Sequence, residues 1–161
     1  MGGIGKTDLA VQYAHLRKDR FDAIFWLEAG GISQLASNFG QIPTDLQLES
    51  AEAAQDLELS IEIAKEWLAT TKVSHDQGSN VPRKRPWLLI FDNADNLDII
   101  LDYIPSTGSG SILVTSRVPA ANTDTFENSF GFDMEPLSEV EAAALLHRLT
   151  RRQGDALNQD E

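Results

Sequence analysis

The feature that most constrains the fold is the glycine-rich start of the chain, Met-Gly-Gly-Ile-Gly-Lys-Thr over residues 1–7. It ends like the phosphate-binding pattern G-x-x-x-x-G-K-[ST], which opens a helix. Glycines let successive backbone N–H groups turn toward phosphate oxygens, and the N-terminus of the following helix adds unpaired donors. A flexible N-terminal tail is the alternative. The pattern predicts phosphate binding by seven consecutive residues: Gly2, Gly3, Ile4, Gly5, Lys6, Thr7 and Asp8.

Two side chains of this loop have predicted roles of their own. The Lys6 ammonium would reach the β and γ phosphates of a nucleotide, and the Thr7 hydroxyl would ligate Mg²⁺. A second magnesium ligand is predicted at Asp92, which ends the apolar run 87–91. Such a run is typical of a buried parallel strand, and ligands bind at the carboxyl ends of parallel strands. The alternative for Asp92 is an aspartate that ends a strand at a turn.

The rest of the chain alternates predicted helices and strands. Residues 72–86 are polar and are predicted to form an exposed loop. This alternation indicates the α/β class, a three-layer P-loop sandwich with a mostly parallel sheet. Apolar spacing predicts helices over 9–16, 32–47 with an interruption at Pro43, 51–71 and 97–104, and strands over 21–27, 87–92, 111–117 and, more weakly, 130–134.

A last helix is predicted after Ser138, which forms an S-x-x-E capping box with Glu141. Residues 1–150 are therefore predicted to form one nucleotide-binding domain, followed by a polar tail over 151–161. The apolar residues of this helix are expected to point inward: Ala142, Leu145, Leu146 and Leu149.

Composition excludes several classes of function. The 161 residues include 13 basic and 25 acidic side chains, a net charge of −12 at pH 7, which argues against nucleic-acid and membrane partners. The basic cluster 83–85 is smaller than a typical nucleic-acid patch and is better explained as the solvated flank of a strand. No run reaches the roughly 18 apolar residues of a membrane span, and there is no cysteine. We therefore expect a cytoplasmic protein.

Five segments, in this order and spacing, resemble the NB-ARC domain of STAND P-loop NTPases, most closely that of fungal NOD-like receptors: GGIGKTDLAVQYA, FDAIFWLEA, LLIFDNAD, GSILVTSR and PLSEVEAAALL. The resemblance covers residues 1–150. It implies an ADP- and ATP-binding switch in signal transduction and innate immunity, with Mg²⁺ held by Thr7 and Asp92. It also implies self-association and a C-terminal repeat or effector domain in a full-length protein.

The resemblance further implies that Arg117, after the TSR strand, senses the γ-phosphate; a surface arginine at a strand end is the alternative. The residue after Asp92 is often acidic in this family and is proposed to activate the attacking water, but here it is Asn93. An amide orients water but cannot accept its proton, so hydrolysis should be slow or absent unless Asp95 substitutes. Asp92, Asn93 and Arg117 are thus the candidate catalytic residues of a switch that, if active, is a slow ATP hydrolase. A P-loop NTPase or kinase with real turnover, or a non-functional fragment, is the alternative.

The family's sheet contains a strand before the phosphate loop, whereas this sequence begins inside the loop. The resemblance places that strand between the Asp92 strand and the TSR strand, so we expect these two strands to keep two unpaired edges. The sequence also stops before the subdomains that enclose ADP in the family. For a chain truncated at both ends we expect weak nucleotide binding and a marginally stable fold.

Overall fold

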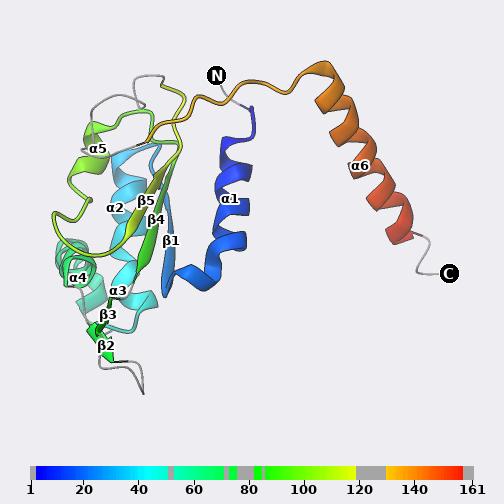
Figure 1. Cartoon of the computed structure of the whole chain (residues 1–161). Coiled ribbons are helices and arrows are strands. Elements are labelled where there is room, and N and C mark those ends of the chain that lie inside the picture. The colour runs from blue at the N-terminus through cyan, green and yellow to red at the C-terminus, as the bar shows by residue number, and fades with distance from the viewer. Residues whose placement is uncertain are drawn as a thin grey trace.

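The structure is a computed structural model that describes residues 3–50, 53–70, 73–75, 82–84, 86–118 and 130–157. Helices and strands alternate along most of the chain (Figure 1). In chain order the elements are α1 (Lys6–Arg17), η1 (Lys18–Arg20), β1 (Ala23–Glu28), α2 (Ile32–Gly40), α3 (Ile42–Asp45), η2 (Ala53–Gln55), α4 (Leu57–Ala69), β2 (Val73–His75), β3 (Pro82–Lys84), β4 (Trp87–Asp92), α5 (Asp98–Leu101), β5 (Ser111–Val114) and α6 (Glu139–Leu157).

The predicted α/β class is confirmed by a parallel sheet of three strands in the order β1-β4-β5. Glu28 of β1 lies opposite Asp92 of β4, so these two strands end together. All six residues of β4 are buried, which explains its continuous apolar run, because a central strand in this class is covered on both faces. β1 is mostly half-buried, although its apolar sequence predicted a strand covered on both faces.

The neighbours of β4 differ from the prediction. We expected β4 and β5 to flank the position of an absent strand and to keep two unpaired edges. They pair directly instead, with Leu88 opposite Ser111 and Phe91 opposite Val114. Direct pairing satisfies the backbone N–H and C=O groups on that side of β4, and leaving buried groups of this kind without partners would be costly.

Two apolar clusters pack on opposite faces of the sheet. The smaller cluster joins Ala10 of α1 to Leu88 and Ile90 of β4. Figure 1 shows α2, α4 and α5 on one side of the sheet and α1 on the other, so the strands form the middle of three layers. The larger cluster joins β1 and β4 to the helices α2 to α5: Leu27, Ala29, Leu35, Phe39, Ile42, Ala64, Leu68, Trp87, Leu89, Phe91, Ala94 and Ile100.

The helix predicted over 51–71 begins only at Leu57. Asp56 is its N-cap, and the Asp56 carboxylate accepts hydrogen bonds from the backbone N–H groups of Glu58 and Leu59 at 3.1 and 3.2 Å. This satisfies two of the donors that a helix start leaves unpaired. The structure thus places the helix start where an aspartate can cap it.

Two other predictions are wrong in part. Within the predicted exposed loop, β2 and β3 pair as a short antiparallel hairpin, with Val73 opposite Lys84. The helix predicted over 97–104 is reduced to α5, and the chain continues in tighter turns in which the Tyr103 N–H donates to the Ile100 carbonyl at 3.0 Å. The interruption predicted at Pro43 is confirmed, since α2 ends before it and α3 is a separate turn.

The strand predicted over 130–134 is absent, and residues 130–138 have no regular structure. Phe130 and Phe132 are fully and largely exposed, and a strand forms only where another strand offers hydrogen-bond partners. The capping box before α6 is confirmed: Ser138 Oγ accepts from the Glu141 N–H at 3.3 Å, and Glu141 Oε2 accepts from the Ser138 N–H at 2.9 Å.

The inward orientation predicted for the apolar side of α6 is wrong. Ala142, Leu145 and Leu146 are all exposed, because α6 stands apart from the sheet, as Figure 1 shows; the Leu149 side chain lies outside the described residues. The helix also continues to Leu157. The division of the chain at residue 150 therefore falls inside a helix and stays a prediction.

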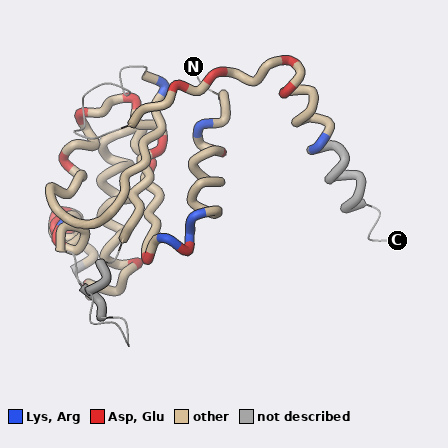
Figure 2. The backbone as a smooth tube through the Cα atoms, in the orientation of Figure 1, with Lys and Arg blue, Asp and Glu red and all other residues tan. Residues whose placement is uncertain are grey.

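None of the helices in the described ranges is long and apolar enough to cross a membrane. Figure 2 shows acidic and basic residues scattered over loops and element ends, and the coloured part of the chain has no continuous basic stripe. Among the described residues, the acidic side chains are thus spread over the chain rather than gathered at one site.

Candidate functional site

The glycine loop ends at the first residue of α1. Gly3 and Gly5 have φ angles of 74° and 92°, a region that residues with a Cβ rarely adopt. Gly5 is the N-cap, and no side chain caps the helix. The first intrahelical bond runs from the Leu9 N–H to the Gly5 carbonyl at 2.9 Å. The first turn of an α-helix leaves backbone N–H groups that the helix itself does not pair, which makes the start of α1 a candidate anion site.

Thr7 connects this loop to the sheet. Its hydroxyl donates to the Asp92 carboxylate, with Oγ1 at 3.0 Å from Oδ1 and 3.1 Å from Oδ2, although the two residues are 85 positions apart in sequence. Asp92 is the last residue of β4 and is 2% exposed. Its backbone carbonyl accepts from the Ala29 N–H at 2.7 Å. The structure thus brings together the two predicted magnesium ligands.

Thr115 also contacts Asp92, and sequence reasoning did not single it out. It follows β5 directly, and its buried hydroxyl donates to Asp92 Oδ1 at 2.5 Å and accepts from the Asn93 N–H at 3.1 Å. Asn93 has a φ of 61°, a conformation that asparagine tolerates better than most residues. The only available signal was a hydroxyl side chain in the polar end of the strand predicted over 111–117. Thr115 fixes both Asp92 and the turn that follows it.

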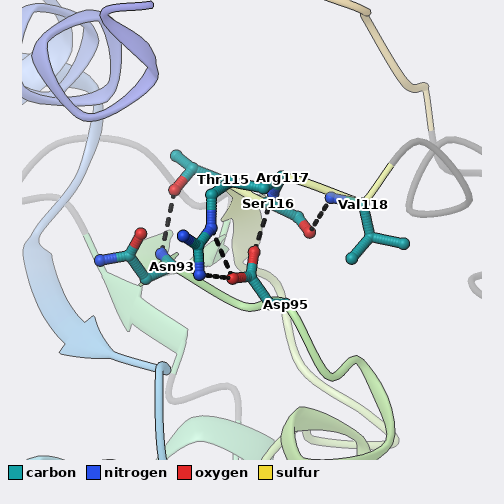
Figure 3. Close-up of polar contacts among 6 residues, drawn as sticks. All are labelled: Asn93, Asp95, Thr115, Ser116, Arg117 and Val118. Carbon is teal, nitrogen blue, oxygen red and sulfur yellow. Dashed lines mark hydrogen bonds and ion pairs between the residues drawn. The ribbon is translucent and has the colours of Figure 1, made fainter. Parts of the chain in front are cut away.

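Arg117 and Asp95 form an ion pair beside this turn (Figure 3). Asp95 Oδ1 accepts from the Arg117 backbone N–H at 2.9 Å, while Oδ2 accepts from Nε at 2.7 Å and also from Nη2. The Arg117 side-chain hydrogen bond is the main reason that the pKa of Asp95 lies below its ordinary value, and Asp95 in turn raises the pKa of Arg117. A carboxylate with a lowered pKa is a weaker base, so Asp95 is poorly suited to replace the acidic residue missing at Asn93.

A hollow of about 150 Å³ lies between the glycine loop and the ends of β4 and β5. Gly2 lies outside the described residues, and Asp92 contacts the lining residue Thr7 but does not itself line the hollow. Pockets for whole drug-sized ligands are about 300–1,000 Å³, so this hollow is too small to enclose a whole ligand of that size. Its lining comprises Gly3, Ile4, Gly5, Lys6, Thr7, Asp8, Asn93, Thr115 and Arg117.

Thr7 and Asp92 carry oxygen atoms of the kind that Mg²⁺ binds in proteins. In this structure these oxygens lie 3.0 and 3.1 Å apart because the Thr7 hydroxyl donates a hydrogen bond to the carboxylate. Within the described residues, no group of three His, Cys, Asp or Glu side chains could hold a metal ion. Mg²⁺ here would need further oxygens from phosphates and water, as is usual for this ion in nucleotide sites.

Comparison with known proteins gives one distant relative. The chain is 27% identical over 142 residues to a nucleotide-binding leucine-rich repeat (NLR)-like protein of Hyaloscypha variabilis. The match covers 76% of this chain but 13% of that protein. No family model matches the chain, and no solved structure matches it. The chain is therefore distantly related to a fungal NLR-like protein, and its three-stranded parallel sheet is consistent with a P-loop NTPase-like domain.

Proposed function

We propose that this chain is the nucleotide-binding module of a STAND-type signalling switch. The glycine loop and the start of α1, together residues 2–8, bind the phosphates of ADP or ATP, and Thr7 and Asp92 hold Mg²⁺. The observation that carries the proposal is the hydrogen bond between Thr7 and Asp92. It joins the start of a helix to the end of a central strand at the wall of a hollow that the glycine loop also lines.

The charges around the hollow support a polyphosphate ligand. Lys6 and Arg117 both line it, and cationic side chains bind phosphate oxygens more strongly than neutral donors do. The N–H groups at the start of α1 add donors and the positive end of the helix dipole. Asp8 contributes a negative charge in the first turn, so its predicted role is carried by its backbone N–H and not by its side chain.

A switch accounts for the site better than an enzyme with fast turnover. Asn93, which lines the hollow, cannot accept a proton from water, and Asp95 is engaged by Arg117. Water can therefore be oriented at Asn93, but the site offers a weak proton acceptor. Bound nucleotide would persist, and the difference between ADP and ATP would act as the signal.

The distant relative is much longer than this chain. We propose that in a protein of that kind the module self-associates when its nucleotide changes and acts on a C-terminal repeat or effector domain. The support for further domains in such a protein is that the match covers 13% of the relative. Signalling in innate immunity is proposed on the same basis.

Calorimetric titration of the 161-residue chain with Mg·ADP and Mg·ATP tests the proposal. Lys6→Ala should weaken binding about 10- to 100-fold, the equivalent of a charge-assisted hydrogen bond of about 1.5–3 kcal/mol. Lys18→Ala is the matched control, because Lys18 is an exposed lysine beyond the far end of α1 and its loss should change the Kd less than twofold.

Equal affinities for the wild-type chain and Lys6→Ala would contradict the proposal. Phosphate release should be measured on the same samples. Steady turnover that Lys6→Ala abolishes would favour the NTPase or kinase alternative, and absence of binding at millimolar nucleotide would favour a non-functional fragment.

A further inference from the structure

We propose that Asp95 is a positioning residue that holds the Arg117 guanidinium at the edge of the hollow, where it meets the terminal phosphate of a nucleoside triphosphate. This inference rests on the proposed function. In this role Asp95 acts through Arg117 to favour triphosphate over diphosphate, and it takes no part in proton transfer.

Both oxygens of Asp95 are used on Arg117. Oδ1 accepts from the backbone N–H at 2.9 Å, and Oδ2 accepts from Nε at 2.7 Å and from Nη2 (Figure 3). One carboxylate therefore fixes the main chain and the side chain of the same arginine. This leaves the guanidinium one orientation among the many that an arginine at the surface would otherwise sample.

Asp95 is itself held in place by the turn after β4. Its N–H donates to the Asn93 carbonyl at 2.8 Å, and the Ala94 N–H donates to the Thr115 carbonyl at 2.8 Å. Thr115 contacts Asp92 directly. The ion pair is thus attached to the same turn that carries the predicted magnesium ligand, so the position of the guanidinium is set relative to the metal site.

Arg117 lines the hollow while it is bound to Asp95. Its hydrogen bonds to Asp95 use Nε and Nη2, and within the described residues Nη1 donates to no protein group. A phosphate can therefore approach the guanidinium without breaking the ion pair. Because the arginine is already ordered, less conformational entropy is lost when a γ-phosphate binds.

The opposite role for Asp95 would be a competitor that keeps Arg117 away from phosphate. The two roles predict opposite changes in one ratio when Asp95 is replaced. This ratio is the Kd of Mg·ADP divided by the Kd of a non-hydrolysable Mg·ATP analogue. Removal of a positioning residue lowers this ratio, whereas removal of a competitor raises it. Because Mg·ATP carries one more negative charge than Mg·ADP, the loss of any carboxylate raises this ratio slightly by long-range electrostatics, and a control variant measures that part.

The experiment measures both Kd values for the wild-type chain, Asp95→Ala, Asp95→Asn, Arg117→Ala and the double variant Asp95→Ala with Arg117→Ala. Asp102→Ala is the control, because it removes one exposed carboxylate that lies outside the hollow. Thermal melts of each variant check the fold. Asp95→Asn keeps an acceptor for the Arg117 backbone N–H and loses the charged hold on the guanidinium, so it separates the side-chain effect from an effect on the loop.

Asp95→Ala and Asp95→Asn should each lower the ratio about three- to tenfold, mainly by weakening the triphosphate analogue. Asp95→Ala should have no further effect in the Arg117→Ala background, because Asp95 acts through Arg117. An unchanged or raised ratio in Asp95→Asn overturns the inference while Lys6-dependent binding still supports the proposed function. Absence of Lys6-dependent binding in the wild-type chain overturns both.

Discussion

The two faces of the sheet are built very differently. On one face, α2 to α5 close a continuous core in which Phe39, Phe91 and Ile100 are fully buried. On the other face, α1 contributes Ala10 as its one fully covered residue among those described, and Leu9 and Leu16 remain exposed. The stability of the domain therefore depends mainly on the first face, whereas α1, which follows the glycine loop, lies on the second.

This division has a functional consequence. A helix that buries little apolar surface gains little free energy from packing, so ligand contacts at its N-terminus make up a larger share of what fixes its position. A ligand that binds only the folded arrangement stabilises it by mass action. We therefore expect nucleotide to order α1 and its loop more than it orders α2 to α5.

The largest loss of stability should follow substitution in β4, where two neighbouring residues point to opposite faces of the sheet. Phe91→Ala opens the larger cluster and should lower the free energy of unfolding by about 3–5 kcal/mol. Ile90→Ala should cost less, about 2–3 kcal/mol, because the thin layer over it can adjust to fill the space. Urea unfolding of both variants measures the two values. A greater loss for Ile90→Ala would contradict the contrast between the faces.

A smaller loss of stability is expected when Thr115, beside the candidate site, is replaced. Thr115→Val removes the hydroxyl that contacts Asp92 and the Asn93 N–H, and it should cost about 1–3 kcal/mol by leaving buried polar groups unpaired. Thr115→Ser keeps the hydroxyl and should cost less than about 1 kcal/mol. Urea unfolding without nucleotide measures both, and a loss for Thr115→Ser as large as that for Thr115→Val would contradict the weight given to the hydrogen bonds.

A local loss of helix stability of about 1 kcal/mol is expected when the cap at the start of α6 is removed. Ser138→Ala removes the capping box, so amide exchange should accelerate within α6 while the main unfolding transition stays in place. A shift of that transition would mean that α6 and the sheet unfold together.

The same cap has a pH dependence. The hydrogen bonds from Ser138 hold the pKa of Glu141 below its ordinary value. The cap therefore contributes fully above the ordinary glutamate pKa of about 4.3 and is lost as the pH falls through the lowered value. Amide exchange in α6, compared with that in Ser138→Ala, should show this loss on acidification; parallel curves for the two chains would contradict it.

The smallest effect should follow a change on the exposed apolar side of α6. Leu146 is 67% exposed, so Leu146→Gln should change the free energy of unfolding by less than about 0.5 kcal/mol. Sedimentation at several protein concentrations is the companion measurement. A loss above 1 kcal/mol, or a loss of association, would show that another surface covers α6.

The sequence predicted the parts of the site whose chemistry restricts the choice of residue. Glycines at positive φ and a Lys-Thr pair at a helix start have few other uses, and an aspartate after a buried apolar run belongs at the carboxyl end of a strand. The contact between Thr7 and Asp92 follows from these restrictions. The roles assigned to these residues stay predictions.

Features that depend on a tertiary partner could not be predicted in the same way. Thr115 resembles any hydroxyl residue after a strand, and only the direct pairing of β4 and β5 places it beside Asp92. The apolar spacing of α6 is as regular as that of α4, but α4 buries Ala64 and Leu68 whereas α6 leaves Leu145 and Leu146 exposed. A helical period defines a face and does not supply the surface that covers it.

The most direct test of the central claim is a paramagnetic NMR measurement with Mn²⁺ in place of Mg²⁺ and ADP as the ligand, since both ions prefer oxygen ligands. If one polyphosphate and its metal lie between the phosphate loop and the end of β4, the backbone N–H signals of Thr7, Asn93 and Thr115 should broaden together, and those of α6 should not. At an ADP concentration near the wild-type Kd, Lys6→Ala should remove most of the effect. Broadening that omits either Thr7 or Asn93, or that persists in Lys6→Ala, would contradict the account.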